Sequence, residues 1–355
     1  MVVDAQYLEV LVAMEKILVI QTAFIGDAVL TLPMIEKLNE KFPSSEIDVL
    51  CIPSTQEIFR ASPFVNQVMV MDKKNEHRSL LNLYKFPNEI KNRNYSKIFS
   101  PHRSFRTSFI VMQSGVRETY GFSTASWFHV YKTVVEYKHK IHEVQRNFDL
   151  IGYGYTHESW KVTPKVNITE ESRQFVRQFL SENELKDKVI AIAPGSIWET
   201  KKYPEKYFQE IAKHYIDQSF KVLVIGSEKD EELCKRITDN LGGKALSTAG
   251  RFSIIETIEL LKNAKLLLTN DSAPTHFGMC ADVPVLTIYC STIPGFGFFP
   301  YNKKSLYISY DDLNCKPCGI HGYEKCPINT FDCGYKLDPK IIISKIDEIL
   351  NDQNK

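Results

Sequence analysis

The stretch from Leu266 to Thr292 holds the residues whose types and spacing most clearly suggest chemistry. An apolar run, Leu266–Thr269, leads into the turn Asn270-Asp271-Ser272, and a helix can begin at Pro274 before a second apolar run, Val285–Tyr289. A helix that begins where a parallel strand ends directs its free N–H groups at the edge of the sheet where α/β proteins bind phosphate. The sequence therefore predicts a nucleotide site at this turn.

Apolar runs alternate with helical patterns twice along the chain, which is typical of parallel sheets covered by helices. In the first half we expect strands at Ile17–Ile20, Ile47–Ile52, Gln67–Met71 and Lys97–Ser100, with helices near Met34–Phe42 and Ser104–Ser114. In the second half we expect strands at Val189–Ala193, Lys221–Ile225, Leu266–Thr269 and Val285–Tyr289, with helices near Pro204–Tyr215, Asp230–Leu241 and Ile254–Asn263. The pattern predicts an α/β fold of two doubly wound, Rossmann-like domains that face each other across a cleft.

The connection between the two halves sets the domain limits that we predict. It is polar and holds one helical pattern, Glu170–Leu180, so residues 166–187 form a linker between an N-terminal domain (14–165) and a C-terminal domain (188–338). We expect residues 339–355 to form a terminal helix that packs back across the junction. Residues 1–13 precede Met14 and the first strand, and we expect them to be a non-essential extension.

Composition and charge exclude several classes of protein. The chain has 355 residues, 43% of them hydrophobic and 25% charged, which is ordinary for a globular protein of two domains. A formal net charge of +1 lacks the basic excess of a general nucleic-acid binder. No apolar run reaches the roughly 18 residues that a membrane-spanning helix needs, and residues 2–13 lack the basic start of an export signal. We therefore expect a cytoplasmic protein.

The glycine pattern argues against a nicotinamide dehydrogenase. Neither half carries G-x-G-x-x-G after its first strand, and the segment Gln21–Asp27 offers Gly26 alone. Without that fingerprint, a dinucleotide pyrophosphate has no glycine-rich turn to approach.

Several ordered motifs together point to a family. They are Ile25-Gly-Asp-Ala-Val-Leu-Thr-Leu-Pro33, Arg103-Ser-Phe-Arg106, Ala193-Pro-Gly-Ser196, Lys201-x-Tyr-Pro204, Asn270-Asp-Ser-x-x-x-His276 and Cys315-Lys-Pro-Cys318…Cys326-Pro327. From about Met14 to its C-terminus, the chain thereby resembles the lipopolysaccharide heptosyltransferases. The resemblance implies a GT-B fold and inverting transfer of heptose from ADP-heptose to the inner core of lipid A. The Gly-Asp motif, the cysteine-rich tail and the Asn-Asp-Ser turn look most like heptosyltransferase II, which extends a first heptose.

Asp27 follows the first strand, and the resemblance implies that it is the catalytic base. Inverting transfer needs a base that takes a proton from the acceptor hydroxyl as its oxygen attacks the anomeric carbon. The alternative is a capping aspartate that accepts hydrogen bonds from the free amides at a helix start, and both roles can hold at once. Because proline disturbs a helix interior, we expect a kink at Pro33 or a new segment from Thr31.

Departure of ADP builds negative charge on its β-phosphate, which a cation, fixed dipoles or a metal must meet. At the positions that the family uses for phosphate contacts, the chain has Lys201, the hydroxyl of Ser196 and the helix start at Ser272 and Ala273. The family often has Gly where Ala273 stands, which predicts a tighter or reshaped turn. Without the resemblance, Lys201 beside Lys202 reads as a solvated surface pair. The chain has no Asp-x-Asp motif for a divalent ion, so we expect no cofactor in catalysis.

Four further residues are candidate donor contacts. Asp271 either contacts a heptose hydroxyl or accepts hydrogen bonds from the amides of its own turn. His276 either touches phosphate or packs as a core histidine. Glu228 can bind the ribose diol or be solvated within its charged run, and the turn at Phe252 can offer backbone contacts to adenine.

Charge suggests where the acceptor binds. Between His102 and Arg146 the chain has seven Lys or Arg (103, 106, 117, 132, 138, 140 and 146) against three Glu (118, 136 and 143), with aromatic side chains among them. An acceptor that carries Kdo carboxylates and lipid A phosphates needs such a surface, and Arg binds both groups through paired hydrogen bonds. We expect Arg103 and Arg106 to bind the acceptor. The aromatics and Lys132 can also seat the protein on an anionic membrane surface.

Four of the eight cysteines are crowded together, at Cys315, Cys318, Cys326 and Cys333. Four thiolates can close a tetrahedral zinc site, which a reducing cytosol favours over disulfides. The spacing is not that of a standard zinc ribbon, so a structural zinc ion, reduced packing cysteines and disulfides all stay open.

The sequence thus predicts an inverting, metal-independent glycosyltransferase that resembles heptosyltransferase II. Its donor would be ADP-L-glycero-D-manno-heptose and its acceptor a Kdo-lipid A type molecule, with or without a first heptose. We expect it at the cytoplasmic face of the inner membrane as a peripheral protein, with no nucleic-acid partner. The alternatives are a glycosyltransferase of the same fold with another donor or acceptor, and a nucleotide-sugar-binding protein without catalysis.

Overall fold

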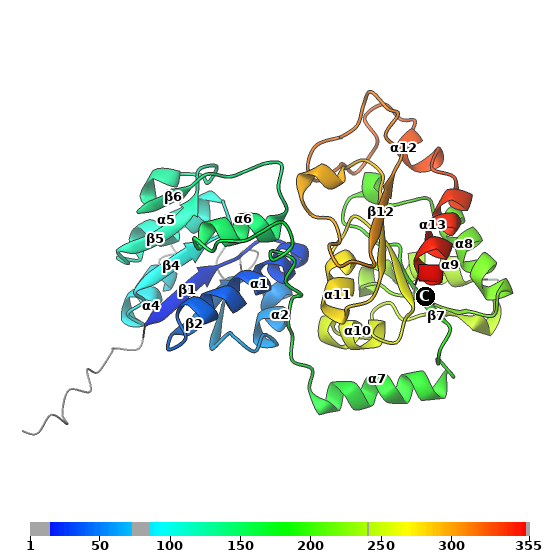
Figure 1. The fold of residues 1–355 in the computed structure, drawn as a ribbon, viewed down its shortest axis with the longest axis horizontal. Coiled ribbons are helices and arrows are strands. Elements are labelled where there is room, and N and C mark those ends of the chain that lie inside the picture. Colours follow the sequence, from blue (N-terminus) through cyan, green and yellow to red (C-terminus); the bar gives the residue numbers. More distant parts are fainter. Residues whose placement is uncertain (1–14, 73–84, 240, 353–355) are drawn as a thin grey trace, which may run out of the picture.

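The computed structural model describes residues 15–72, 85–239 and 241–352, which form two α/β domains (Figure 1). In this part of the chain, each domain is built on a six-stranded parallel sheet. The strand orders are β3-β2-β1-β4-β5-β6 in the N-terminal domain and β12-β11-β10-β7-β8-β9 in the C-terminal domain. Both orders reverse direction next to the first strand of the sheet, β1 or β7, which is where doubly wound proteins place their ligands. The predicted pair of doubly wound sheets is confirmed.

The N-terminal domain alternates strands and helices as the sequence predicts. Its strands are β1 (Lys16–Ile20), β2 (Glu46–Cys51), β3 (Gln67–Val70), β4 (Lys97–Ser100), β5 (Glu118–Phe122) and β6 (Thr133–Val135). Its helices are α1 (Ile25–Lys41), α2 (Gln56–Arg60), α4 (Lys85–Asn92), α5 (Phe105–Gln113) and α6 (Glu143–Leu150). The sequence missed β5 and β6, the outer strands on one side of the sheet, because they are short and interrupted by polar residues or Gly.

The C-terminal domain follows after α7 (Glu170–Glu182), the helix predicted within the linker. Its strands are β7 (Val189–Ala193), β8 (Lys221–Val224), β9 (Ala245–Ser247), β10 (Leu266–Asn270), β11 (Val285–Tyr289) and β12 (Leu306–Ser309). Its helices are α8 (Glu205–Asp217), α9 (Glu231–Thr238), α10 (Ile254–Leu261), α11 (Pro274–Ala281), α12 (Asp332–Tyr335) and α13 (Pro339–Asp352). The sequence missed the two edge strands, β9 and β12.

The alternative of a new segment from Thr31 is wrong, because α1 runs from Ile25 to Lys41 as one helix; the kink at Pro33 stays a prediction. The helix is buried from Ala28 to Ile35, so packing outweighs the local cost of proline. Side chains also engage backbone carbonyls in this stretch: Asn147 Nδ2 donates to the Leu30 carbonyl at 3.0 Å and Thr31 Oγ1 to the Asp27 carbonyl at 2.7 Å. The helix therefore starts at Ile25 and places Asp27 in its first turn.

The terminal helix does not pack across the junction, which corrects a second prediction. The stripe of Ile342, Ile346 and Ile349 on α13 is buried in the core of the C-terminal domain. Tyr215 of α8 donates its hydroxyl to the Ile343 carbonyl at 3.1 Å. An apolar stripe at this spacing needs one partner surface, and α8 supplies it within the same domain.

Several contacts join the two domains. The Glu57 carboxylate at the start of α2 accepts hydrogen bonds from the backbone N–H groups of Ile254 (3.3 Å) and Ile255 (3.1 Å), where a negative charge complements the first turn of α10. The backbone N–H of Glu143 donates to the Gly297 carbonyl at 2.8 Å. The predicted domain limits stay a prediction, and the predicted extension, residues 1–13, lies outside the described residues. Within the described ranges, the structure contains no helix with the length and apolar character to span a membrane.

Candidate active site

Asp27 lies three residues after Phe24, the N-cap of α1. From there its carboxylate can accept hydrogen bonds from backbone N–H groups at the helix start. Burial, with a smaller contribution from the nearby Glu143 carboxylate, raises the pKa of Asp27 from 3.8 to about 7, while the backbone N–H groups of Asp27 and Phe24 and the Arg103 guanidinium limit the rise. A carboxyl group that titrates near neutral pH is suited to accept a proton in a reaction. The position is compatible with both predicted roles, base and cap.

A buried ion pair lies beside Asp27. Glu143, the first residue of α6, accepts a 2.7 Å hydrogen bond on Oε2 from Nη1 of Arg146. The Arg146 guanidinium also donates to the carbonyl of Phe296 in the C-terminal domain, at 2.9 Å. Two guanidinium groups pack against the Tyr137 ring, with Cζ of Arg103 at 4.0 Å and Cζ of Arg146 at 4.8 Å from the ring centre. These cation–π contacts hold Arg103 near the Asp27 carboxylate.

Sequence reasoning missed the Glu143–Arg146 pair. The available signal was a Glu and an Arg three residues apart at the start of an amphipathic helix, but that pattern is common on solvated helix faces.

Of the two predicted acceptor residues, Arg103 also donates to Thr124 Oγ1 at 3.1 Å, whereas Arg106 lies in the first turn of α5 and is half-buried.

Asn270 ends β10 and connects two loops at the edge of the C-terminal sheet. Its fully buried side chain donates through Nδ2 to the Pro194 carbonyl at 2.7 Å and accepts through Oδ1 from the Tyr203 backbone N–H at 3.0 Å. These bonds fix the loop after β7 and the segment that carries Lys201. Asn270 is thus a structural residue that positions the groups around it.

Replacing Asn270 with Ala is expected to lower the free energy of unfolding by about 3 kcal/mol, because one carbonyl and one N–H are left buried without partners. Urea denaturation followed by circular dichroism measures the change. Asn263→Ala is the matched control, since that side chain is exposed and makes one 3.2 Å bond to the Glu259 carbonyl. Equal losses in the two variants would contradict the structural role of Asn270.

Lys201 is not a solvated surface residue. Its Nζ lies 2.6 Å from Oδ2 of Asp271, and both side chains are largely buried, with 14% and 12% of their surface exposed. Thr292 Oγ1 donates to the same carboxylate oxygen at 2.7 Å. Lys202 instead pairs with Glu199. Asp271 therefore binds Lys201 and Thr292 through Oδ2, and the Lys201 ammonium explains how a carboxylate can lie beside a phosphate site.

The first turn of α11 offers free hydrogen-bond donors. In the described part of the chain, the backbone N–H groups of Ser272 and Ala273 have no acceptor, and Pro274 follows at the first helical position. The Ser272 hydroxyl donates to the Gly195 carbonyl at 3.2 Å, which brings the loop that carries Ser196 to this turn. Two free amides, a helix dipole and the nearby Lys201 form a suitable anion site.

His276 lies where the two domains meet. Its ring is buried, and a Cβ atom at Gly26 would stand only 3.0 Å from its Cδ2 atom, so glycine lets α1 approach α11 closely. Burial lowers the pKa of His276 to about 4; Asp271 opposes the shift and Lys201 adds to it. The ring is therefore neutral at pH 7. Its Nδ1 is buried without a hydrogen-bond partner among the described residues, which leaves one polar atom for a ligand.

The remaining predicted donor residues lie farther along the sheet edge. Glu228 begins a short 3₁₀ helix after β8 and is exposed. Gly250 approaches it so closely that a Cβ atom there would stand 3.1 Å from Cγ of Glu228. The Phe252 ring packs on Phe175 and Phe179 of α7, with ring centres 5.3 and 5.1 Å apart. Glu228 is thus open to a ligand, whereas the Phe252 side chain is a packing residue and only its backbone suits the predicted role.

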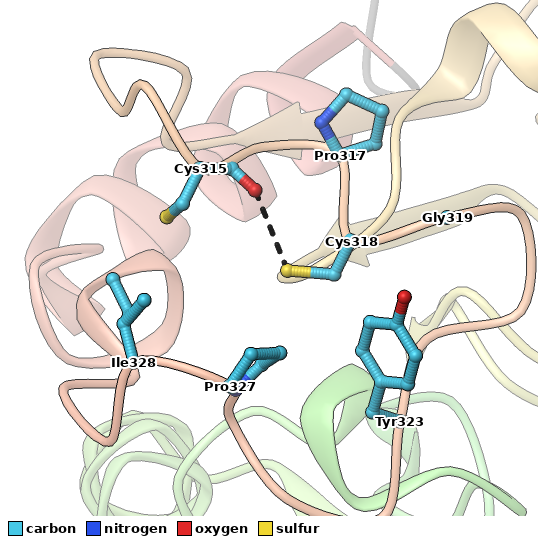
Figure 2. Close-up of a pocket in the computed structure, with 7 residues that line it drawn as sticks. All are labelled: Cys315, Pro317, Cys318, Gly319, Tyr323, Pro327 and Ile328. Atoms are coloured by element: carbon cyan, nitrogen blue, oxygen red, sulfur yellow. Dashed lines mark hydrogen bonds between the residues drawn. The ribbon is translucent and has the colours of Figure 1, made fainter.

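The four crowded cysteines belong to a segment between β12 and α13, and Figure 2 shows two of them, Cys315 and Cys318. Cys315 and Cys318 line a pocket of about 250 Å³, and the Cys318 thiol lies 3.5 Å from the Cys315 carbonyl oxygen. All four are free thiols. Burial opposes ionisation of Cys326, but backbone N–H groups of residues 328–331 outweigh it and lower its pKa. Among the described residues, no three His, Cys, Asp or Glu side chains are arranged to hold a metal ion, so structural zinc stays a prediction.

The same segment also braces the candidate anion site. The Thr200 backbone N–H donates to the Tyr323 carbonyl at 3.0 Å, and the Tyr323 N–H donates to Thr200 Oγ1 at 2.8 Å. A Cβ atom at Gly322, whose φ is +80°, would stand 2.9 Å from the Thr200 hydroxyl and 3.1 Å from Cγ of Lys201. The cysteine-rich segment therefore fixes the loop that presents Lys201.

Comparison with known proteins gives consistent matches. A family model described as glycosyltransferase family 9 (heptosyltransferase) matches residues 83–324, more than half of the chain. The chain is 23% identical over 341 residues to lipooligosaccharide heptosyltransferase 2 of Campylobacter jejuni, covering 94% of this chain and 99% of that protein. Other similar proteins are named heptosyltransferase 1 and 3, so similarity alone does not select one type.

Two solved structures resemble the whole chain. The glycosyltransferase of family 9 from Veillonella parvula has a TM-score of 0.84 at 22% identity, covering 95% of this chain and 98% of that one. ADP-heptose lipopolysaccharide heptosyltransferase II of Escherichia coli has a TM-score of 0.77 at 18% identity, covering 96% and 100%. This likeness establishes that the fold is of the GT-B type.

Proposed function

Because the chain belongs to glycosyltransferase family 9, the heptosyltransferases, we propose that it transfers heptose from ADP-L-glycero-D-manno-heptose to the inner core of lipopolysaccharide. The observation that supports this most directly is the contact between Gly26 and His276, since it brings the helix start that carries Asp27 against the helix that carries the anion site. A base and a leaving-group site on opposite sides of one junction suit a displacement at a sugar carbon.

In this proposal Asp27 takes the proton of the acceptor hydroxyl while that oxygen bonds to the anomeric carbon of heptose. The bond from that carbon to the β-phosphate oxygen breaks, and ADP leaves with the electron pair. Attack opposite to the leaving group inverts the anomeric centre. The raised pKa of Asp27, about 7, supports this role because a general base works best when its pKa is close to the working pH.

The leaving diphosphate would be met by Lys201 and by the amides of Ser272 and Ala273. These fixed donors stabilise developing charge without a metal ion. The hydroxyl of Ser196 and Nδ1 of His276 would be further contacts, and the exposed Glu228 would bind the ribose hydroxyls of ADP. Asp271 would act mainly by holding the Lys201 ammonium in place.

Arg103 and Arg106 would bind carboxylates or phosphates of a Kdo-lipid A type acceptor. Arg103 is already held near Asp27 by its contact with Tyr137. A type II activity, in which the acceptor bears one heptose, rests on the motifs named above. Because such an acceptor is anchored in a bilayer, the enzyme would work as a peripheral protein at the cytoplasmic face of the inner membrane.

A panel of ADP-sugars and core acceptors tests the proposal. With ADP-heptose and a monoheptosylated acceptor, the purified protein should release ADP and add the mass of one heptose to the acceptor, as seen by mass spectrometry. Transfer only from another donor, or only to another acceptor, would replace the proposed substrates. Donor binding without transfer to any acceptor would show a nucleotide-sugar-binding protein.

Replacing Glu143 with Gln should shift the acid limb of the kcat/KM profile to lower pH, by on the order of half a pH unit or more. The change removes a negative charge that raises the pKa of Asp27 and leaves the Arg146 cation unneutralised, and both effects lower that pKa. Glu136→Gln, an exposed change in the same domain, is the control and should leave the profile in place. An acid limb that is unchanged in Glu143→Gln, or that moves to higher pH, would contradict the assignment of Asp27 as the base whose titration sets this limb.

A further inference from the structure

The corner of the N-terminal domain formed by α5 and the loop before β6 exposes large apolar side chains. Phe105, Met112, Trp127 and Phe128 expose 39%, 44%, 41% and 47% of their surface, and we call these four residues the apolar corner. Phe105 and Met112 are seven residues apart on α5 and so share one face of the helix. The Trp127 ring packs edge-on against Phe105, with ring centres 4.3 Å apart. Figure 1 shows α5 and β6 at the same end of this domain.

The protein holds this corner in a fixed shape. Trp127 adopts a left-handed backbone conformation with φ of 57°, which is uncommon for a bulky residue. Two hydrogen bonds of the preceding residue maintain it: the Ser126 N–H donates to the Arg103 carbonyl at 2.9 Å and the Ser126 carbonyl accepts from the Ser108 hydroxyl. Single exposed apolar residues are ordinary, but a contiguous group that is held outward marks an interaction surface.

The charges around the corner have one sign. The segments 101–113 and 123–131, which build it, contain no Asp or Glu and carry Arg103 and Arg106. Arg117, Glu118 and Lys132 lie together at the start of β5, where the Lys132 N–H donates to Thr119 Oγ1 at 2.9 Å and the Glu118 carboxylate is 3.5 Å from Nζ of Lys97. Exposed aromatic rings bordered by basic side chains match the boundary between headgroups and acyl chains of an anionic bilayer.

We propose that the apolar corner docks this domain onto an anionic lipid surface. The inference rests on the proposed function, because a lipid-anchored acceptor explains why such a surface adjoins the arginine motif. The Ser126–Arg103 hydrogen bond joins the two directly, so an acceptor headgroup at a docked corner lies next to Arg103 and the junction that holds Asp27. Insertion of Trp127 and Phe128 fixes the height of the enzyme above the bilayer.

Vesicle sedimentation with the full chain tests this. Wild-type protein should bind vesicles that contain phosphatidylglycerol, bind phosphatidylcholine vesicles far less, and lose binding as salt rises. The double variant Trp127→Ser/Phe128→Ser should bind anionic vesicles at least tenfold more weakly. The control Tyr335→Ser/Ile341→Ser removes two residues of comparable exposure, 52% and 48%, from the C-terminal domain and should bind as the wild type does.

Two further measurements separate the outcomes. The double variant should retain the wild-type rate on a deacylated, soluble acceptor and lose about tenfold or more in rate on the acylated acceptor in vesicles. If the wild type fails on the soluble acceptor, the proposed function is refuted, and the vesicle-binding result still tests the docking proposal independently. Unchanged vesicle binding by the variant, or none by the wild type, would overturn the docking proposal. A wild-type dimer that the variant converts to a monomer, seen by light scattering, would also overturn it by making the corner a contact between copies.

Discussion

Replacing Asp27 with Asn should reduce kcat/KM by about 100- to 10,000-fold, the range that a positioned general base contributes. The amide keeps the size of the side chain but cannot take the proton of the acceptor hydroxyl. Wild-type kcat/KM should rise with pH through an apparent pKa of about 7, because only the deprotonated carboxylate is active. Initial rates of ADP release, measured from about pH 5 to about pH 9, give both the loss of kcat/KM in the variant and the pH dependence of the wild type.

Stability provides an independent readout for the same variant. The pKa of Asp27 is about 7 in the folded protein against an ordinary 3.8, so between these pH values the folded state binds the additional proton. The stability that this carboxyl group contributes is therefore present at low pH and is lost as pH rises through 7. Because Asn has no such titration, Asp27→Asn should gain stability relative to the wild type as pH rises.

The control for Asp27 lies on the same helix. Glu40→Gln changes an exposed carboxylate near the end of α1 that pairs with Lys37, and it should leave both rate and stability close to wild type. ADP-heptose binding should survive in Asp27→Asn, since the donor contacts lie on the other domain. Near-normal turnover in Asp27→Asn would remove this residue as the base.

Replacing Lys201 with Met should lower kcat by about 100- to 1,000-fold and weaken binding of ADP, because the variant lacks the cation that meets the departing β-phosphate. The change has a second effect. Lys201 also neutralises Asp271, and an unpaired carboxylate at this largely buried position should cost about 2 to 3 kcal/mol of stability. Isothermal calorimetry with ADP, steady-state kinetics and urea denaturation measure the three quantities.

The double variant Lys201→Met/Asp271→Asn separates these effects. Removing both charges should restore most of the stability, since no unpaired carboxylate remains, while the rate stays low. Recovery of the rate together with the stability would show that Lys201 acts only by holding Asp271, and would refute its role at the phosphate.

Most of the central strands could be predicted because their sequences are mainly apolar runs. β1, β4, β7, β10 and β11 are buried, and such runs mark the inner strands of a parallel sheet. The outer strands β5, β6, β9 and β12 are only three to five residues long, and their pairing depends on neighbours that are distant in the chain. Local propensity also did not reveal that α1 continues past Thr31 and Pro33, where burial of the helix outweighs the local cost of proline.

The places of candidate site residues near strand ends could also be predicted from the sequence: Asp271 directly follows β10, and Asp27 lies in the first turn of α1, the helix after β1. Partners across the fold could not. Asp271 binds Lys201 and Thr292, and Glu143 lies beside Asp27, because the sheet order brings separate loops to one edge. Sequence spacing carries no signal for such contacts. Similarly, the stripe on α13 predicted a packed helix but did not reveal that its partner is α8.

A crystal structure with ADP-2-deoxy-2-fluoro-heptose, an unreactive donor analogue, tests the central claim most directly. We expect the β-phosphate within hydrogen-bond distance of Lys201 Nζ and the Ser272 and Ala273 amides, with the anomeric carbon turned towards the Asp27 carboxylate. A diphosphate bound away from α11, or an anomeric carbon that faces away from Asp27 with no room for an acceptor hydroxyl between them, would contradict the account.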